Sequence, residues 1–263
     1  MGNICIIGPR ASGKTTYLAA LAYCQDKRQR QARTKIYNIQ PLNEEAKQLT
    51  AQSENIIQQG LSFEPNIVGD KIKTPDDLHY YSFMIEVKNT LLSKPERFQL
   101  NAKDYPGEVF EDITKHKDFI DECLMKDVVG CLILFTGWEK GEDSSYYQLM
   151  SKFIDAMNNE NRIQDLRLAV AMSKCERGEI WPGRLDPETD LFGVHLPKTL
   201  KTLKDKILRK NLRFYAMSTF GVLGRNNPRP NRIDRGGKES VLRDAAKWRP
   251  YNLVEPLYWL SKG

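Results

Sequence analysis

The sequence predicts an α/β fold in which a mostly parallel sheet of about six strands lies between helices on both faces. Short apolar runs alternate with amphipathic stretches along the chain, which is the pattern of parallel strands joined by helical crossovers. Most of the apolar runs are rich in β-branched and aromatic residues, as buried strands are. We expect a single domain over residues 1–263, with insertions at about 25–73 and 221–250.

The predicted strands are short and well separated, with one exception. Eight residues lie between the second and third strands, which is too few for a helical crossover, so these two strands must pair antiparallel. The strands are expected at 3–7, 80–88, 97–103, 128–135, 167–172 and 212–217. Helices are expected after Thr15 and near 43–59, 110–126, 144–158, 196–210 and 252–261. The Gly-, Pro- and Arg-rich segment 221–250 is expected to be a long, partly mobile loop.

The composition is typical of a cytosolic globular protein. A formal charge of +6 is basic without resembling a dedicated nucleic-acid binder. The five cysteines include no Cys-x-x-Cys pair, so neither a disulfide framework nor a zinc site is indicated. The strongest apolar run, 128–135, is far shorter than the ~20 residues that cross a bilayer. We therefore expect no membrane span.

A complete phosphate-binding loop, or Walker A motif, follows the first predicted strand: Gly8-Pro9-Arg10-Ala11-Ser12-Gly13-Lys14-Thr15. The spacing of its glycines lets successive N–H groups point at phosphate oxygens, helped by the positive end of the next helix. Lys14 is expected to reach the β- and γ-phosphates, and the Thr15 hydroxyl to ligate Mg²⁺. The fold is therefore predicted to be a three-layer P-loop nucleotide-binding fold. Its expected phosphate contacts are Gly8, Ala11, Ser12, Gly13, Lys14, Thr15 and Thr16.

A second motif, Asp104-Tyr105-Pro106-Gly107-Glu108, comes directly after the third predicted strand. Because the carboxyl end of that strand should lie beside the phosphate loop, Asp104 is expected to hold Mg²⁺ and the Gly107 N–H to face the γ-phosphate. Thr74 is our choice for a further threonine that contacts Mg²⁺. Thr50 is the alternative, and either residue could instead be a helix cap.

Two later segments follow the last two predicted strands. Ser173-Lys174-Cys175-Glu176 resembles the Asn-Lys-x-Asp guanine-recognition motif of the Ras-like GTPases, with Ser and Glu in place of Asn and Asp. The resemblance implies that the Lys174 stem packs on the base and that Glu176 accepts hydrogen bonds from guanine N1–H and N2–H. Ser218 and Thr219 stand where such GTPases carry their last base-contacting loop, so they are further candidates.

These motifs occur in the order found in Ras-like GTPases of the translation-factor-related class. Within that class the chain is most similar to the bacterial double-GTPase group, which has Asp-x-Pro-Gly and Ser/Thr-Lys-Cys-Asp-like motifs. The resemblance covers 3 to about 220 and 254–260, and leaves out both insertions. It implies a switch that binds GTP or GDP with Mg²⁺ and hydrolyses GTP, with 25–73 and 104–126 changing conformation. It also implies a role in a bacterial conflict or signalling system.

Two candidate catalytic residues lie close to the expected γ-phosphate, besides Lys14 and Gly107. Familiar GTPases use a Gln where this chain has Glu108, and a carboxylate adds negative charge to an anionic transition state. We therefore expect slow intrinsic hydrolysis, unless Arg10 offsets that charge. Arg10 could equally point to solvent. The competing functions are an ATP-using P-loop enzyme and a nucleotide-binding scaffold with little hydrolysis.

Basic residues are concentrated in two segments. The range 221–250 holds eight basic and three acidic side chains, and Lys27, Arg28, Arg30, Arg33 and Lys35 form a second group. Such a run is either a solvated face or a docking surface for an acidic protein partner or effector. Nucleic acid is a further possible partner, but Trp248 and Tyr251 are too few aromatics to argue for base stacking.

Overall fold

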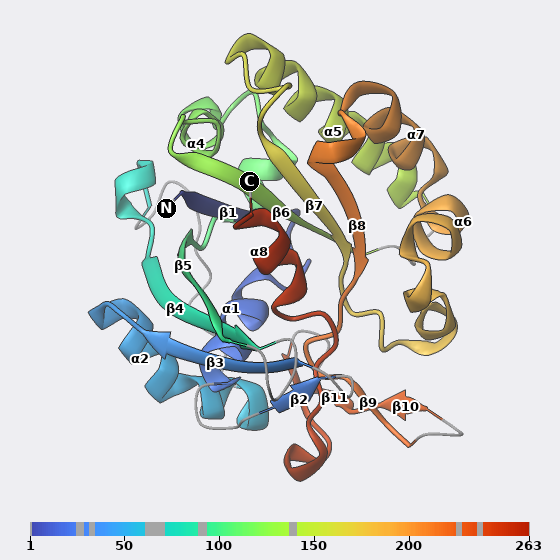
Figure 1. Cartoon of the computed structure of the whole chain (residues 1–263). Coiled ribbons are helices and arrows are strands. Elements are labelled where there is room, and N and C mark those ends of the chain that lie inside the picture. Colours follow the sequence, from blue (N-terminus) through green and yellow to red (C-terminus); the bar gives the residue numbers. More distant parts are fainter. Residues whose placement is uncertain are drawn as a thin grey trace.

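The computed structural model describes residues 2–24, 29–31, 35–60, 72–88, 94–136, 141–224, 228–235 and 239–262. Four parallel strands form the centre of this part of the chain, in the order β1-β6-β7-β8 (Figure 1). They are β1 (Asn3–Ile7), β6 (Val128–Phe135), β7 (Arg167–Met172) and β8 (Leu212–Ala216). All four were predicted within one residue of their ends, and the predicted α/β class is confirmed.

A second, antiparallel sheet continues from the edge of the parallel one. Its order is β2-β3-β4-β5, and β5 lies beside β1 through a parallel bridge between Ile6 and Asp104. The predicted antiparallel pairing of the second and third strands is confirmed, with Tyr80 opposite Lys103. The strands are β2 (Gln29–Gln31), β3 (Lys35–Pro41), β4 (Tyr80–Lys88) and β5 (Glu96–Lys103). More of the structure is therefore antiparallel than predicted.

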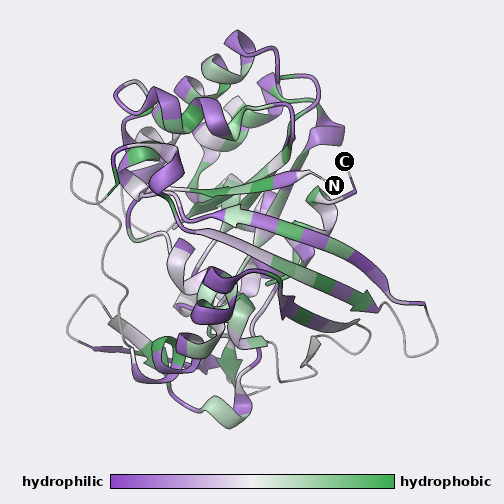
Figure 2. Cartoon of the chain, turned by 90° about the vertical axis from the view of Figure 1, so that its left-hand side faces the viewer, coloured by the Kyte–Doolittle hydropathy of each residue, from purple (hydrophilic) through white to green (hydrophobic). Residues whose placement is uncertain are grey.

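Hydrophobic cores lie on both faces of the parallel sheet, which gives three layers. Ile4 and Ile6 of β1 pack in one core with residues of α1 (Lys14–Tyr23) and α8 (Glu255–Leu260). The alternate residues Cys5 and Ile7 pack in the other core, because successive strand residues point to opposite faces. That second core contains residues of α4 (Lys117–Cys123), α5 (Glu142–Asn159) and α7 (Pro197–Lys206). It also contains Phe192 and Leu196, which flank the short helix α6 (Gly193–His195). Figure 2 shows hydrophobic residues along the strands and many hydrophilic residues on the outer helices.

The predicted helix at 43–59 is present and covers the antiparallel sheet. It consists of α2 (Glu44–Glu54) and a π-helical turn, η3 (Asn55–Gln59). The Asn43 side chain accepts a hydrogen bond from Ala46 N and so caps the helix. Within the described residues, no helix combines the length and the apolar character that a bilayer crossing requires. The remaining short helical turns are η4 (Pro75–Asp77), η5 (Gly178–Leu185), η6 (Pro187–Phe192), η7 (Arg209–Asn211) and η8 (Ala245–Lys247).

The helix predicted at 110–126 is instead two helices, α3 (Gly107–Glu111) and α4. Asp112 leaves the helical conformation, and its carboxylate accepts a hydrogen bond from Lys115 N. Aspartate side chains compete with helical hydrogen bonds in this way. Helix α3 begins at Gly107, which lies directly beside the phosphate loop.

The prediction of a long loop over 221–250 is wrong for the described part of that segment. Two antiparallel pairs form there: β9 (Val222–Leu223) with β10 (Arg229–Pro230), and β11 (Arg232–Arg235) with β12 (Glu239–Leu242). Asn231 is fully buried between the pairs. Its side chain bonds both backbone groups of Asp244, which fixes the start of β11. The side chains of the other basic group at 27–35 lie outside the described residues.

Candidate nucleotide-binding site

A cavity of about 520 Å³ lies at the carboxyl ends of strands β1, β5, β7 and β8. Ligands of α/β proteins bind at this edge of the sheet, and the volume is in the range of small-molecule sites. Four predicted motifs contribute to its wall, although they are far apart in the sequence. The wall contains Arg10–Tyr17, Asp104–Glu108, Ser173, Lys174, Glu176, Met217, Thr219 and Phe220.

The phosphate loop has the curled backbone that its sequence predicts. Ala11 and Gly13 have φ angles of 58° and 93°, and Gly8 has a φ of 154°. A Cβ atom on Gly8 would lie 2.4 Å from the Leu134 carbonyl oxygen, so only glycine fits there. The Ser12 hydroxyl is buried in this loop without a hydrogen-bond partner among the described residues. A buried polar atom of this kind indicates a missing ligand or solvent atom.

Lys14 lies inside the loop as a buried cation. Its Nζ donates to the carbonyl oxygens of Gly8, at 2.7 Å, and Pro9, at 3.0 Å. Burial lowers the pKa of Lys14 to about 8, and the carboxylates of Asp104 and Glu111 partly offset this effect. The ammonium group is thus placed where an anion would be stabilised.

Thr15 and Asp104 form a pair of oxygen ligands beside Lys14. Thr15 Oγ1 donates to Asp104 Oδ2 at 2.8 Å, and burial raises the pKa of Asp104. A hydroxyl and a carboxylate fit Mg²⁺, which takes few protein oxygens and completes its shell with phosphate and water. The described residues contain no cluster of three or more His, Cys, Asp or Glu side chains that could hold a metal ion.

Arg10 connects the phosphate loop to α3. Its guanidinium forms an ion pair with Glu108, and its backbone N donates to Glu111 Oε1 at 2.6 Å. A Cβ atom on Gly107 would lie 2.4 Å from Arg10 N, so the two backbones are in close contact. The Arg10 side chain is 62% exposed. The structure therefore brings Arg10, Gly107 and Glu108 together.

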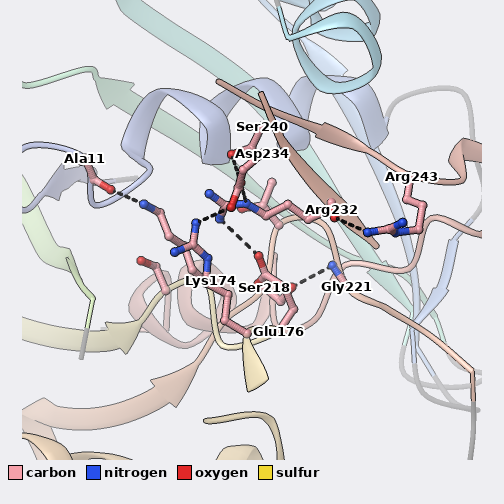
Figure 3. Close-up of polar contacts among 12 residues, drawn as sticks. Ala11, Lys174, Glu176, Ser218, Gly221, Arg232, Asp234, Ser240 and Arg243 are labelled. Carbon is pink, nitrogen blue, oxygen red and sulfur yellow. Dashed lines mark hydrogen bonds and ion pairs between the residues drawn. The ribbon is translucent and has the colours of Figure 1, made fainter. Parts of the chain in front are cut away.

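Glu176 also lines the cavity and is 1% exposed. Neither of its carboxylate oxygens has a hydrogen-bond partner among the described residues. Lys174 Nζ donates to the Ala11 carbonyl oxygen at 2.6 Å and so spans the space between Glu176 and the phosphate loop (Figure 3). Burial, followed by Arg232 and Arg177, lowers the pKa of Lys174 to about 8. Ser173 Oγ donates to Ser12 O at 2.8 Å, which ties the two loops together.

The other predicted site residues are placed less directly. Thr219 lines the cavity, whereas Ser218 is buried and its hydroxyl accepts a hydrogen bond from Gly221 N at 2.7 Å. Thr74 donates from its backbone N and its hydroxyl to Asp77, at the start of η4. The Thr50 hydroxyl donates to the Ala46 carbonyl oxygen within α2. Neither threonine lines the cavity in the described structure, so a metal-binding role for Thr74 stays a prediction.

Sequence reasoning missed several residues of the cavity wall, among them Phe220, Arg232 and Ser240. Arg232 and Ser240 come from the β11–β12 hairpin, in the segment that was predicted as a loop. A charged residue in a Gly- and Arg-rich stretch carries no signal that would single it out. Trp248, considered for stacking, is buried, and its Nε1 donates to the Thr219 carbonyl oxygen at 2.8 Å.

No family model matches the chain, and no curated protein matches it. Among solved structures, it is similar to the Ski7 GTPase-like domain of S. cerevisiae bound to GTP, with 16% identity and a TM-score of 0.47 over 99% of this chain and 49% of that one. It is also similar to a chain of the signal recognition particle receptor SRb-GTP/SRX complex from Chaetomium thermophilum, with 10% identity and a TM-score of 0.41 over 84% and 92%.

Translation elongation factor SelB from Methanococcus maripaludis, in complex with the GTP analogue GPPNHP, is a third similar structure. It has 13% identity and a TM-score of 0.36, over 83% of this chain and 30% of that one. The chain thus spans less than half the length of the Ski7 and SelB chains. At these identities and TM-scores, the function of this chain has to be inferred from its own site.

Proposed function

We propose that the chain binds GTP and GDP and hydrolyses GTP slowly, as a molecular switch. The observation that carries this proposal is that a buried cation and a buried carboxylate line one cavity of about 520 Å³. A phosphate loop with the buried Lys14 cation forms part of its wall, and the Glu176 carboxylate, with no hydrogen-bond partner in the described structure, forms another part. The phosphates of a guanine nucleotide suit the phosphate loop and Lys14, and the two N–H donors of guanine suit the Glu176 carboxylate.

Glu176 provides the reason to favour guanine over adenine. Guanine N1–H and N2–H can both donate to a carboxylate, whereas adenine presents an acceptor at N1 and has no amine at C2. Adenine would therefore leave the buried carboxylate oxygens unpaired, which is a costly arrangement. Thr219 and the Lys174 stem complete the proposed base site.

Mg²⁺ would be held by Thr15 and Asp104, where it would neutralise charge that develops on the phosphates. Gly107 and Lys14 would donate to the γ-phosphate. The ion pair between Arg10 and Glu108 supports slow hydrolysis, because each side chain is engaged by the other. A protein partner, a docking role for 221–250, a cytosolic location and a part in a bacterial conflict system stay predictions from sequence.

Calorimetric comparison of GDP and ADP binding in excess Mg²⁺ tests the proposal. We expect tighter binding of GDP, and we expect Glu176→Ala to remove on the order of 1–3 kcal/mol of that preference. Lys14→Ala should abolish binding of both nucleotides, because it removes the phosphate-facing cation. Glu188→Ala is the matched control, because Glu188 forms an ion pair with Lys204 away from the cavity.

Tighter binding of ADP than GDP would favour the ATP-using alternative. An unchanged GDP to ADP affinity ratio in Glu176→Ala would show that this carboxylate does not read the base. If GTP bound with no turnover at saturating Mg²⁺, the chain would be a nucleotide-binding scaffold.

A further inference from the structure

Glu176 forms an ion pair with a residue from a part of the chain outside the predicted motifs. The Nη1 atom of Arg232 lies 3.5 Å from Glu176 Oε1 (Figure 3). The Arg232 side chain is 8% exposed and that of Glu176 is 0% exposed, so the pair is buried. The contact is an ion pair rather than a hydrogen bond, and it leaves both carboxylate oxygens without a hydrogen-bond partner among the described residues.

The Arg232 side chain is held in this position from several sides. Its Nε donates to Asp234 Oδ1, and its guanidinium lies 5.7 Å from the centre of the Phe220 ring. Asp234 is fixed in turn by Ser240 Oγ, at 2.8 Å, and by Arg177 Nη2, at 3.0 Å. Because Arg177 directly follows Glu176, Asp234 ties the hairpin to the base-recognition loop.

The β11–β12 hairpin that carries Arg232 is anchored to the body of the protein. Val241 and Leu242 of β12 are buried, and Leu242 belongs to the core that α1 and η3 share. At the start of the hairpin, Asn231 N donates to the Gly221 carbonyl oxygen at 2.9 Å. Arg232 therefore enters the cavity from a fixed element rather than from a free chain.

A buried carboxylate without a charge partner is neutralised or moves towards water, because burial penalises its charge. Arg232 supplies the opposing charge from a distance that does not consume a hydrogen-bond acceptor site. A guanidinium that lies near an aromatic ring and is hydrogen-bonded to a carboxylate is well suited to supply a buried positive charge, because it stays protonated and is weakly hydrated. The result is a fixed anion with two oxygens available to a ligand.

We propose that Arg232 is a positioning residue for guanine selectivity, which makes the β11–β12 hairpin a structural part of the base site. This inference rests on the proposed function and adds an element that the sequence motifs do not contain. The hairpin would hold Glu176 in position, with an opposing charge beside it, before the nucleotide arrives. Guanine selectivity should then depend on a residue 56 positions further along the chain than Glu176.

The test is the GDP to ADP affinity ratio of Arg232→Ala, measured by calorimetry in Mg²⁺. We expect the ratio to fall by about tenfold or more, because truncating one member of a buried charge pair leaves the other uncompensated. Affinity for inorganic pyrophosphate, which occupies only the phosphate loop, should stay unchanged. Arg232→Lys should restore much of the ratio, because the contact needs charge rather than a hydrogen bond.

Arg235→Ala is the matched control, since it removes the same charge from an exposed position on the same strand. It should leave the ratio unchanged. If Arg232→Ala proves too unstable to purify, Asp234→Asn loosens Arg232 without removing it and should lower the ratio in the same direction. A merely structural role would weaken pyrophosphate binding along with GDP binding, and that result would overturn the proposal.

Other outcomes separate this inference from the proposed function. If the wild-type chain prefers GDP and Arg232→Ala keeps the same ratio, the inference is wrong and the proposed function stands. Tighter GDP binding by Arg232→Ala would show that Arg232 obstructs the base, which also overturns the inference. If the wild-type chain does not prefer GDP, both are wrong.

Discussion

Lys14 is a buried residue whose charge should couple nucleotide binding to pH. Burial lowers the pKa of Lys14 to about 8, and phosphate oxygens would raise it again by favouring the charged form. Below about pH 8 the lysine is already protonated, so binding needs no proton. Above that pH, binding must take up a proton, and affinity should fall by up to about tenfold per pH unit. The affinity for GDP should therefore decrease as pH rises through about 8.

Calorimetry in two buffers of different ionisation enthalpy would measure this proton uptake directly. We expect almost none at about pH 7 and a clear uptake at about pH 8.5. Lys174 has a similarly lowered pKa, so the variant Lys174→Arg, which stays charged, removes its contribution. Uptake that disappears in this variant would assign the effect to Lys174 instead of Lys14.

Arg10 and Glu108 should affect hydrolysis in opposite directions. The variant Glu108→Gln removes one negative charge near the transition state and releases Arg10 from its ion pair. We expect a higher single-turnover rate of GTP hydrolysis at saturating Mg²⁺. Arg10→Ala should lower the rate if the guanidinium stabilises the transition state, and nucleotide affinity is measured separately for each variant.

Glu188→Gln is the control for the hydrolysis experiment and should leave the rate unchanged, because Glu188 forms an ion pair with Lys204 away from the cavity. A slower Glu108→Gln variant would make the carboxylate a working participant in orienting water. Unchanged rates in both Arg10 and Glu108 variants would leave activation to a partner.

At the scale of elements, sequence reasoning succeeded where a local pattern determines the structure. The four parallel strands were predicted because each is a short, continuous apolar run. Helix α1 was predicted because it follows the characteristic spacing of the phosphate loop. Strand β3 was missed because Lys35–Pro41 mixes polar and apolar residues. Its partner β4 is also distant in the sequence, since β4 begins only at Tyr80. Such pairing depends on distant contacts that no local window contains.

The same reasoning explains the error over 221–250. Glycine, proline and arginine indicate a loop when read locally. The described strands there are two to four residues long, and they are held by Asn231, whose buried side chain bonds Asp244. A single buried asparagine cannot be recognised from sequence, because its partner is thirteen residues away.

Across the whole molecule, the site is assembled from both sheets. The phosphate loop and Glu176 follow parallel strands, whereas Asp104 follows β5 of the antiparallel sheet, which contacts β1 through Ile6. Most of the cavity wall was predicted because strand ends of an α/β sheet converge at one edge. Arg232 was not, because its approach depends on the packing of a C-terminal hairpin.

A γ-phosphate would be sensed through contacts that link the phosphate loop to α3, α4 and β5. In this structure α3 contacts the phosphate loop through Gly107 and through the bond from Arg10 N to Glu111. Tyr105, two residues before Gly107 in the same motif, donates a hydrogen bond to Glu122 of α4. Glu122 also forms an ion pair with Lys103 of β5. A group that moves Gly107 should therefore disturb α3, α4 and the end of β5 together.

Hydrogen exchange of the chain loaded with GDP or with a non-hydrolysable GTP analogue would detect this change. We expect the difference between the two nucleotides to be concentrated in 104–126 and in the described end of the first insertion, 72–78. The latter should respond because Lys103 Nζ donates to the Pro75 carbonyl oxygen at 2.9 Å. Helix α7 serves as the internal control, because its hydrogen bonds and ion pair link it to Asp143 of α5 and to Glu188 rather than to α3. Helix α5 is not suitable, because its Phe153 ring lies 6.0 Å from the Phe110 ring of α3. A difference confined to α7, or none anywhere, would contradict a γ-phosphate switch, because the link from Gly107 to Glu122 would then carry no change.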